Sequence, residues 1–165
     1  MNEKDLSLID NFKGLLTFKI NGEYFCSDMA NIVEIINPSE LNQEENINSD
    51  SPHINLGVVK IAMIDLYKIF GLNSKQRTED DRIIVVEINN QFLCFLVDKI
   101  CNIYSLDKDI INEIEFEPFK RIIHLTGILK LKKKNLFLLD FNSIASSELK
   151  KVNGESFSKN NIENE

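Results

Sequence analysis

Few residues of this chain have the types and spacing that catalysis or metal binding requires. The two histidines, His53 and His124, are 71 positions apart, and no carboxylates or thiols cluster with either of them. A metal site or catalytic triad needs such clustering, so we expect His53 to lie in a loop and His124 to be an ordinary strand residue. Gly-rich phosphate loops, HExxH and GxSxG are missing from the sequence. The sequence therefore predicts no enzyme, no cofactor and no essential metal.

Asp65 and Asp140 come closest to a catalytic pair, since acid–base chemistry often uses two carboxyl groups in different environments. Each follows an apolar stretch and precedes a short possible helix. At that position an Asp side chain accepts hydrogen bonds from exposed backbone N–H groups, so we predict that both are helix caps. The acidic run Glu79-Asp80-Asp81 lacks the alternating ligands and central Gly of a calcium-binding EF-hand loop. We predict a solvated turn there.

An internal duplication gives the strongest indication of architecture. Residues 18–35 (FKINGEYFCSDMANIVEI) match residues 86–103 (VEINNQFLCFLVDKICNI), 68 positions later. Residues 63–69 (MIDLYKI) then match residues 138–144 (LLDFNSI), 75 positions later. Solenoid repeats have periods of about 20 to 50 residues, so a single duplication of this length predicts two similar subdomains packed together.

The composition permits a folded domain and argues against some partners. The chain has 165 residues, of which 43% are hydrophobic, and its net charge is −7. An acidic protein has no long-range attraction to nucleic acid or to anionic membranes. We therefore expect no nucleic-acid partner, and subdomains of this size should share an interface because each alone would bury little surface.

The cysteines and apolar runs predict a cytosolic protein. Cys26, Cys94 and Cys101 are odd in number and lack CxxC spacing, so we expect free, buried thiols. No run approaches the ~18 apolar residues of a membrane span. The first ten residues lack the basic and apolar regions of a signal peptide. We expect no direct membrane insertion.

Three hairpins organise the predicted strands. Asn21-Gly22 and Asn89-Asn90 each separate two apolar stretches and tolerate the positive φ angles of tight turns. The lysine run 132–134 separates residues 128–131 from 136–139, which indicates a third hairpin with a basic tip. We interpret that tip as a solvated turn and not as a nucleic-acid site.

Helix is scarce in the predicted fold. We expect short helices over residues 66–70 and 143–151, and a long mobile loop over residues 38–52. Residues 1–11 and 151–165 are predicted to be flexible tails. Residues 12–150 then form the domain, with a first barrel over about 15–78 and a second over about 79–150. Small barrels suit many short strands because closure removes exposed edges.

The order of these segments resembles the CheW-like family of bacterial chemotaxis coupling proteins over about residues 15–150. The resembling stretches are LLTFKINGEYFCSDMANIVEII, GVVKIAMIDLYKIFG, RIIVVEINNQFLCFLVDKICNIYSL and LTGILKLKKKNLFLLDFNSI. Most telling are the segment 64–66 followed by Phe70-Gly71, and the segment 96–100 followed by Ile103. The resemblance implies a mainly β fold: two five-stranded SH3-like barrels packed around a shared core, with a short C-terminal helix.

The resemblance also implies a function. Proteins of this family are non-catalytic adaptors that bridge the cytoplasmic tips of chemoreceptors (methyl-accepting chemotaxis proteins) and the regulatory domain of the histidine kinase CheA. A cytoplasmic location at membrane-associated receptor arrays would follow. The residues at the family's receptor-binding positions are Ile32, Glu34, Asp98, Ile100 and Ile103. The three isoleucines would anchor a helix in a groove between the barrels, although core packing is the alternative for each; for Ile35 we prefer the core.

The kinase-binding residues implied by the resemblance are Gly57, Val58, Phe116 and Phe119, with core packing as the alternative for both phenylalanines. One departure affects this surface. The family usually carries Asn-Leu-Arg-Gly here, whereas residues 55–58 are Asn-Leu-Gly-Val. Either Arg and Gly are replaced or the tetrapeptide is deleted. The alternative function is therefore a CheW-like interaction scaffold outside chemotaxis, or a divergent paralogue with weak kinase coupling.

Overall fold

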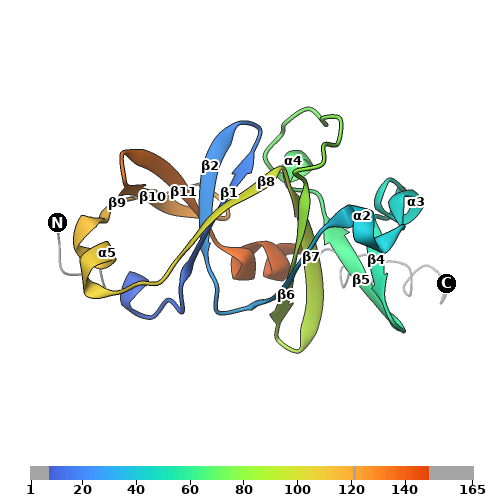
Figure 1. Ribbon diagram of the computed structural model, residues 1–165, viewed down its shortest axis with the longest axis horizontal. Coiled ribbons are helices and arrows are strands. Elements are labelled where there is room, and N and C mark those ends of the chain that lie inside the picture. The colour runs from blue at the N-terminus through green and yellow to red at the C-terminus, as the bar shows by residue number, and fades with distance from the viewer. Residues whose placement is uncertain (1–7, 121, 149–165) are drawn as a thin grey trace, which may run out of the picture.

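Two β-sheets make up most of the molecule and lie side by side along its long axis (Figure 1). The computed structural model describes residues 8–120 and 122–148. Sheet A has six strands in the order β8 (Lys99–Tyr104), β1 (Leu15–Ile20), β2 (Glu23–Asp28), β11 (Lys134–Leu139), β10 (Leu125–Leu131) and β9 (Glu115–Pro118). Sheet B has five, in the order β3 (Ile32–Ile36), β6 (Arg82–Ile88), β7 (Gln91–Val97), β5 (Val59–Ile64) and β4 (His53–Leu56). The predicted mainly β fold is confirmed, with one strand more than expected in sheet A.

The two sheets exchange their hairpins, and this corrects the predicted division into barrels over 15–78 and 79–150. Hairpin β1–β2 joins the later strands β8 to β11 in sheet A. Hairpin β6–β7 joins the earlier strands β3 to β5 in sheet B. In Figure 1 the blue β1 and β2 accordingly lie beside the orange strands near the opposite end of the chain. Each half of the sequence therefore supplies the central hairpin of the other half's sheet.

Strand register confirms the duplication. In sheet B, Met63 lies opposite Cys94 where β5 and β7 run parallel, and in sheet A Leu138 lies opposite Cys26 in the same way. The antiparallel pairing of β3 with β6 in sheet B also matches that of β8 with β1 in sheet A. The register shifts just after Ile32 in β3 and just after Ile100 in β8. The two halves thus share their pairing pattern residue by residue.

Local sequence explains the hairpin turns and the helix starts. Asn21-Gly22 and Asn89-Asn90 all have positive φ, as tight hairpin turns require. Asp65 accepts a hydrogen bond from the Lys68 backbone N–H at 3.2 Å and caps α4 (Leu66–Ile69). Asp140 caps the helix over 141–148 through the N–H of Ser143, also at 3.2 Å. The predicted capping role of both carboxylates is confirmed.

Several local predictions were wrong. The expected loop over 38–52 contains α2 (Pro38–Leu41) and α3 (Glu44–Ile47), because Asn37 caps α2 and Ile47 is buried. The helix α5 (Lys108–Glu113) was missed, although Asp107 caps it. The final helix begins two residues earlier than expected and is described only to residue 148, so its predicted end at 151 and the tail 151–165 lie outside the described residues.

Both histidines also differ from expectation. His53 is the first residue of β4 and not part of a loop. His124 occupies the turn before β10 with a φ of 72°, where its ring Nδ1 lies 2.8 Å from the Ser143 hydroxyl. This contact links the turn to the final helix.

Three apolar clusters hold the sheets together. The central cluster, which includes Phe18, Phe95 and Phe141, draws side chains from both sheets. A second cluster packs within sheet A and a third within sheet B. Ile9 is fully buried in the second cluster, so the predicted flexible tail is wrong for residues 8–11; residues 1–7 lie outside the described part. The shared core between two strand units is the arrangement the duplication predicted.

Cysteine placement follows these clusters. Cys26 is buried in the cluster of sheet A and Cys94 in that of sheet B, whereas Cys101 is only partly buried. All three thiols are free. Burial raises the pKa of the Cys26 and Cys94 thiols, to about 12 for Cys94. Both buried thiols are therefore protonated at neutral pH, which fits the expected role as packing residues.

Candidate functional site

The edge strands β3 and β8 carry the apolar residues assigned to receptor binding, and each is the outermost strand of its sheet. Ile32 lies opposite Val86, and Ile100 lies opposite Phe18. Both isoleucines are half-buried and pack against the central cluster from opposite sheets. Ile103 is different, since 59% of it is exposed. The structure therefore brings Ile32 and Ile100 to one cluster and leaves Ile103 accessible on β8.

The neighbouring residues of β3 do not alternate in exposure, since Val33 and Glu34 are both exposed. Glu34 is exposed, and Ile35 packs partly buried against the central cluster, as we preferred from the sequence. Val33, which stands between Ile32 and Glu34, is 52% exposed. The register shift between Ile32 and Glu34 places it at an irregularity of the strand. No sequence signal indicated that irregularity, so Val33 was missed.

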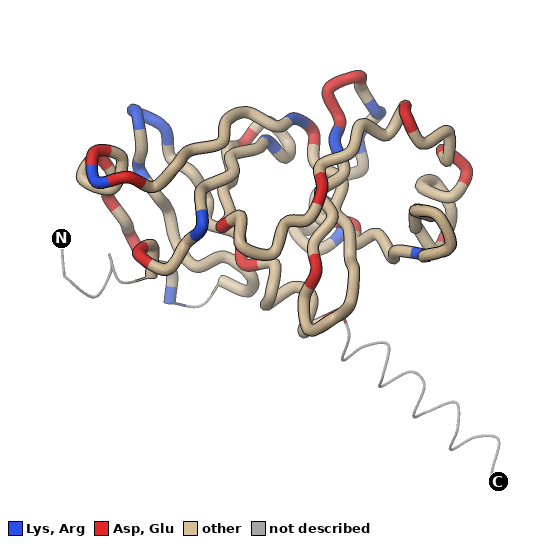
Figure 2. The backbone as a smooth tube through the Cα atoms, turned by 60° about the horizontal axis from the view of Figure 1, so that its bottom comes forward, with Lys and Arg blue, Asp and Glu red and all other residues tan. Residues whose placement is uncertain are grey.

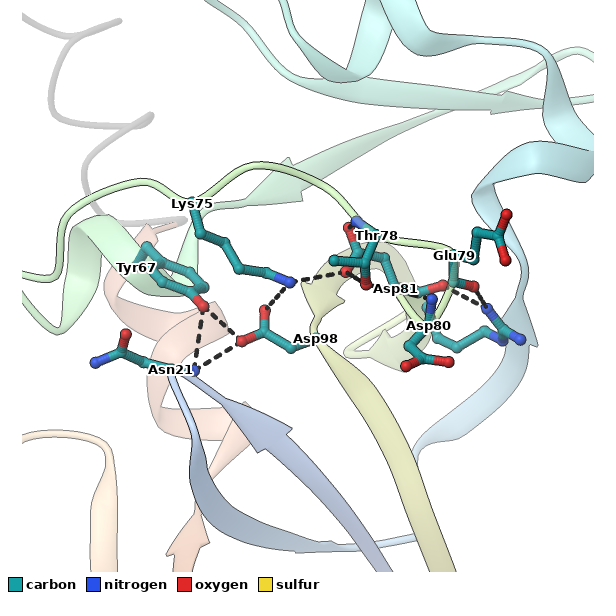
Figure 3. Close-up of polar contacts among 9 residues, drawn as sticks. Asn21, Tyr67, Lys75, Thr78, Glu79, Asp80, Asp81 and Asp98 are labelled. Carbon is teal, nitrogen blue, oxygen red and sulfur yellow. Dashed lines mark hydrogen bonds and ion pairs between the residues drawn. The ribbon is translucent and has the colours of Figure 1, made fainter.

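Asp98 is held by a polar network at the start of β8 (Figure 3). Its Oδ2 accepts hydrogen bonds from the Tyr67 hydroxyl at 2.5 Å and from the Asn21 backbone N–H at 2.7 Å. Its Oδ1 lies 3.4 Å from the Lys75 ammonium. These contacts join the β1–β2 turn, helix α4 and the loop after it to β8. Asp98 therefore positions the strand that carries Ile100 and Ile103; its direct contact with a receptor stays a prediction.

Lys75 extends the network to a second carboxylate. Its Nζ lies 3.1 Å from Asp81 Oδ1, and Asp81 also accepts hydrogen bonds from the backbone N–H and the hydroxyl of Thr78. Asp81 is buried, so the predicted solvated turn is correct for Glu79 and Asp80 but wrong for this residue. A buried carboxylate needs such partners. The sequence did not indicate that Lys75, six positions before Asp81, supplies one of them.

The network shifts the proton affinity of two of its members. Burial, the hydrogen bond to Asp98 and the charge of that carboxylate all raise the pKa of the Tyr67 hydroxyl. For Lys75, burial acts to lower the pKa, but the hydrogen bond to Asp81 and the charges of both carboxylates outweigh it, so the pKa is raised. Tyr67 therefore stays a hydrogen-bond donor and Lys75 stays a cation at neutral pH.

The residues assigned to kinase binding lie in two places. Gly57 and Val58 form the turn between β4 and β5, where Gly57 has a φ of 60° and Val58 is fully exposed. Phe116 lies on β9, at the outer edge of sheet A, and packs against the second cluster. Phe119 contacts the ring of Phe137 at 6.3 Å between centroids. The structure does not bring the turn and the two phenylalanines onto one sheet.

Within the described ranges, the side chains offer protein contacts and no clustered metal ligands. No group of three or more His, Cys, Asp or Glu residues converges among residues 8–120 and 122–148. Every helix in the same ranges is too short or too polar to traverse a bilayer. The exposed groups on β3, β8 and the β4–β5 turn include aliphatic side chains, one carboxylate, one ammonium and one amide: Val33, Glu34, Val58, Lys99, Asn102 and Ile103.

Comparison with known proteins places this surface in context. The sequence model of the CheW-like domain matches residues 14–149, from β1 through β11. The crystal structure of the scaffolding protein TtCheW from Thermoanaerobacter tengcongensis is similar, with a TM-score of 0.62 and 26% sequence identity. That match covers 78% of this chain and 89% of TtCheW. No curated protein sequence matches the chain.

Proposed function

Because this chain belongs to the CheW-like domain family, we propose that it is a non-catalytic adaptor that couples chemoreceptors to the histidine kinase CheA. The observation that carries the proposal is the extent of the family match, which covers both sheets and the described part of the final helix. The similarity to a scaffolding protein supports it. Under this proposal the protein works in the cytoplasm at membrane-associated receptor arrays.

The receptor surface of this adaptor consists of the two edge strands. Ile103 and Val33 are apolar and exposed, Glu34 is an exposed carboxylate, and Ile32 and Ile100 form the half-buried floor beside the central cluster. An amphipathic helix binds such a surface by placing its apolar face on the aliphatic residues. Asp98 contributes to this surface indirectly, because its contacts with Tyr67, Asn21 and Lys75 fix the start of β8.

The kinase surface of this adaptor includes the β4–β5 turn and the edge strand β9. Either Gly57 and Val58 stand where the family usually carries Arg and Gly, or the family tetrapeptide is deleted; Val58 is fully exposed at this turn. Neither glycine nor valine can form the ion pairs of a guanidinium. This difference supports a second candidate: a CheW-like scaffold outside chemotaxis, or a paralogue whose kinase coupling is weak.

Co-sedimentation with receptor-containing membranes and purified CheA, together with the kinase rate, tests the proposal. We expect the wild-type protein to sediment with receptor membranes and to increase incorporation of CheA. Ile103→Asp should weaken sedimentation, whereas Ile123→Asp, at a more exposed isoleucine before β10, should not. Sedimentation with receptors but no change in CheA recruitment or rate would support the second candidate. Failure to bind receptor membranes would refute coupling.

A further inference from the structure

A row of lysines crosses sheet A around one aromatic ring. The ammonium groups of Lys19 on β1 and Lys134 on β11 each lie 4.7 Å from the centroid of the Tyr24 ring on β2. The two ammonium nitrogens are therefore no more than twice that distance apart. Lys99 on β8 is the cross-strand partner of Lys19, so lysines from the three strands β8, β1 and β11 lie around Tyr24 on β2. The row continues at the β10–β11 turn with Lys132 and Lys133, whose tip is a continuous blue stretch in Figure 2.

These five lysines, the basic cluster, have no acidic partner among the described residues. The ion pairs of the described ranges both involve Lys75, which bridges Asp81 and Asp98. Glu23 is adjacent to Tyr24 in β2, but successive side chains of a strand point to opposite faces. The composition does not predict such a group of lysines without carboxylates, because the net charge of the protein is −7.

Two features of the basic cluster oppose folding stability. Lys19 and Lys99 are like charges directly opposite each other in an antiparallel pair, which is destabilising. Lys132 and Lys133 have φ angles of 49° and 64°. Tight hairpin turns with two positive φ angles favour Asn and Gly, and the chain uses those residue types at its other two such turns, Asn21-Gly22 and Asn89-Asn90. Strained non-Gly residues of this kind concentrate at functional positions.

We propose that the basic cluster docks a short acidic segment of a partner protein, with carboxylates paired to the ammonium groups of Lys19 and Lys134 on either side of Tyr24. Lys99 lies between Asp98 and Ile100, which were assigned to receptor contact, whereas Lys19, Lys132, Lys133 and Lys134 are outside both assigned surfaces. Both ammonium groups lie 4.7 Å from the same ring centroid, so one acidic segment can reach both of them. An anionic bilayer is the poorer partner, since the net charge opposes approach to a charged plane. Nucleic acid would require a longer basic stripe with stacking aromatics.

Substitutions in the β10–β11 turn can separate an effect on binding from an effect on folding stability. Lys132→Asn combined with Lys133→Gly removes two charges and supplies the residues that the turn geometry favours. We expect its thermal midpoint to rise while its affinity for hexaglutamate falls about fivefold, as for the loss of two exposed ion pairs. Asn90→Gly is the matched control, because it changes an equivalent turn without changing charge; it should leave hexaglutamate binding unaltered.

The readout is a titration of the isotope-labelled full-length protein with hexaglutamate, followed by amide chemical shifts at low and high salt. Shifts should localise to β1, β2, β8 and the β10–β11 turn, and should vanish in high salt. Lys19→Gln with Lys134→Gln should abolish them, while Lys60→Gln on sheet B should not. Shifts spread evenly over all exposed lysines, or an unchanged affinity in the turn variant, would overturn the proposal. Tighter binding to phosphatidylserine vesicles or to single-stranded DNA than to the peptide would also overturn it.

Discussion

The Tyr67 hydroxyl donates a hydrogen bond of 2.5 Å to the Asp98 carboxylate and thereby joins helix α4, from the first half of the chain, to the start of β8 in the second. The same carboxylate accepts from the Asn21 N–H and faces Lys75. The Tyr67 hydroxyl, the Asn21 N–H and the Lys75 ammonium thus come from separate segments and share the Asp98 carboxylate as their partner. The position of β8, which carries Ile100 and Ile103, depends on this contact.

Replacing that acceptor should destabilise the protein. Asp98→Ala leaves the Tyr67 hydroxyl, the Asn21 N–H and Lys75 without their shared partner, and we expect a loss of about 2–3 kcal/mol in the free energy of unfolding. Asp98→Asn keeps an acceptor oxygen and should lose less. Urea denaturation measures both, with exposed Asp80→Ala as control. If Asp98→Ala were fully stable yet failed to bind receptor, the carboxylate would contact the receptor directly.

The isoleucines of the edge strands should respond differently to a charge. Ile32→Asp and Ile100→Asp place a carboxylate against the central cluster and should lower stability by about 1–3 kcal/mol. Ile103→Asp should fold with a thermal midpoint near that of the wild type, because 59% of the side chain is exposed, but should weaken receptor binding by about 2 kcal/mol. Thermal melts and receptor co-sedimentation test this. A stable Ile103→Asp variant that binds normally would remove Ile103 from the receptor surface.

Gly127 should not tolerate a side chain. A Cβ at this position of β10 would lie 2.4 Å from the Glu117 carbonyl oxygen and 2.6 Å from the Phe116 ring. We expect Gly127→Ala to cost about 2 kcal/mol, because β9 and the ring it carries must move. Gly14→Ala is the control, since its nearest atoms would be at 3.4 Å. Equal thermal midpoints for the two variants would show that Phe116 is not packed over β10.

Stability should decline at alkaline pH. An unfolded chain releases its thiol protons near the usual pKa of 9.0, whereas burial keeps the folded Cys26 and Cys94 protonated to higher pH. The raised pKa values of Tyr67 and Lys75 act in the same direction. The unfolded state then binds fewer protons, so the free energy of unfolding falls as pH rises above about 9. Urea denaturation across this range tests the decline, which Cys94→Ala should reduce; a slope unchanged by that variant would contradict the thiol contribution.

The exchange of hairpins predicts complementation between half-chains. Fragments 8–78 and 79–148 each lack the central hairpin of the sheet that holds most of their strands. Neither should show a cooperative thermal transition alone, because the exposed edges of β3, β5, β8 and β11 would be unpaired. Co-expression should yield a folded complex, detectable by co-purification through a tag on one fragment. A cooperative transition in fragment 79–148 by itself would contradict this prediction.

Features encoded over a few neighbouring residues could be predicted from the sequence. The turns at Asn21-Gly22 and Asn89-Asn90 depend on backbone preferences of those residues, and the capping roles of Asp65 and Asp140 depend on N–H groups three positions later. The duplication also lies in the sequence as a pattern. These features together determined the mainly β fold with two related units.

Only the tertiary structure decided which strands pair and which charges are buried. The two hairpins present equivalent side chains, so a pattern of residue types does not distinguish pairing within a half from exchange between halves. Packing between the sheets made that choice, and it also brought Tyr67, Lys75 and Asp81 around Asp98 and left Ile103 in solvent beside half-buried Ile100. Such contacts join residues distant in sequence, and their free energies depend on burial, which no local pattern records.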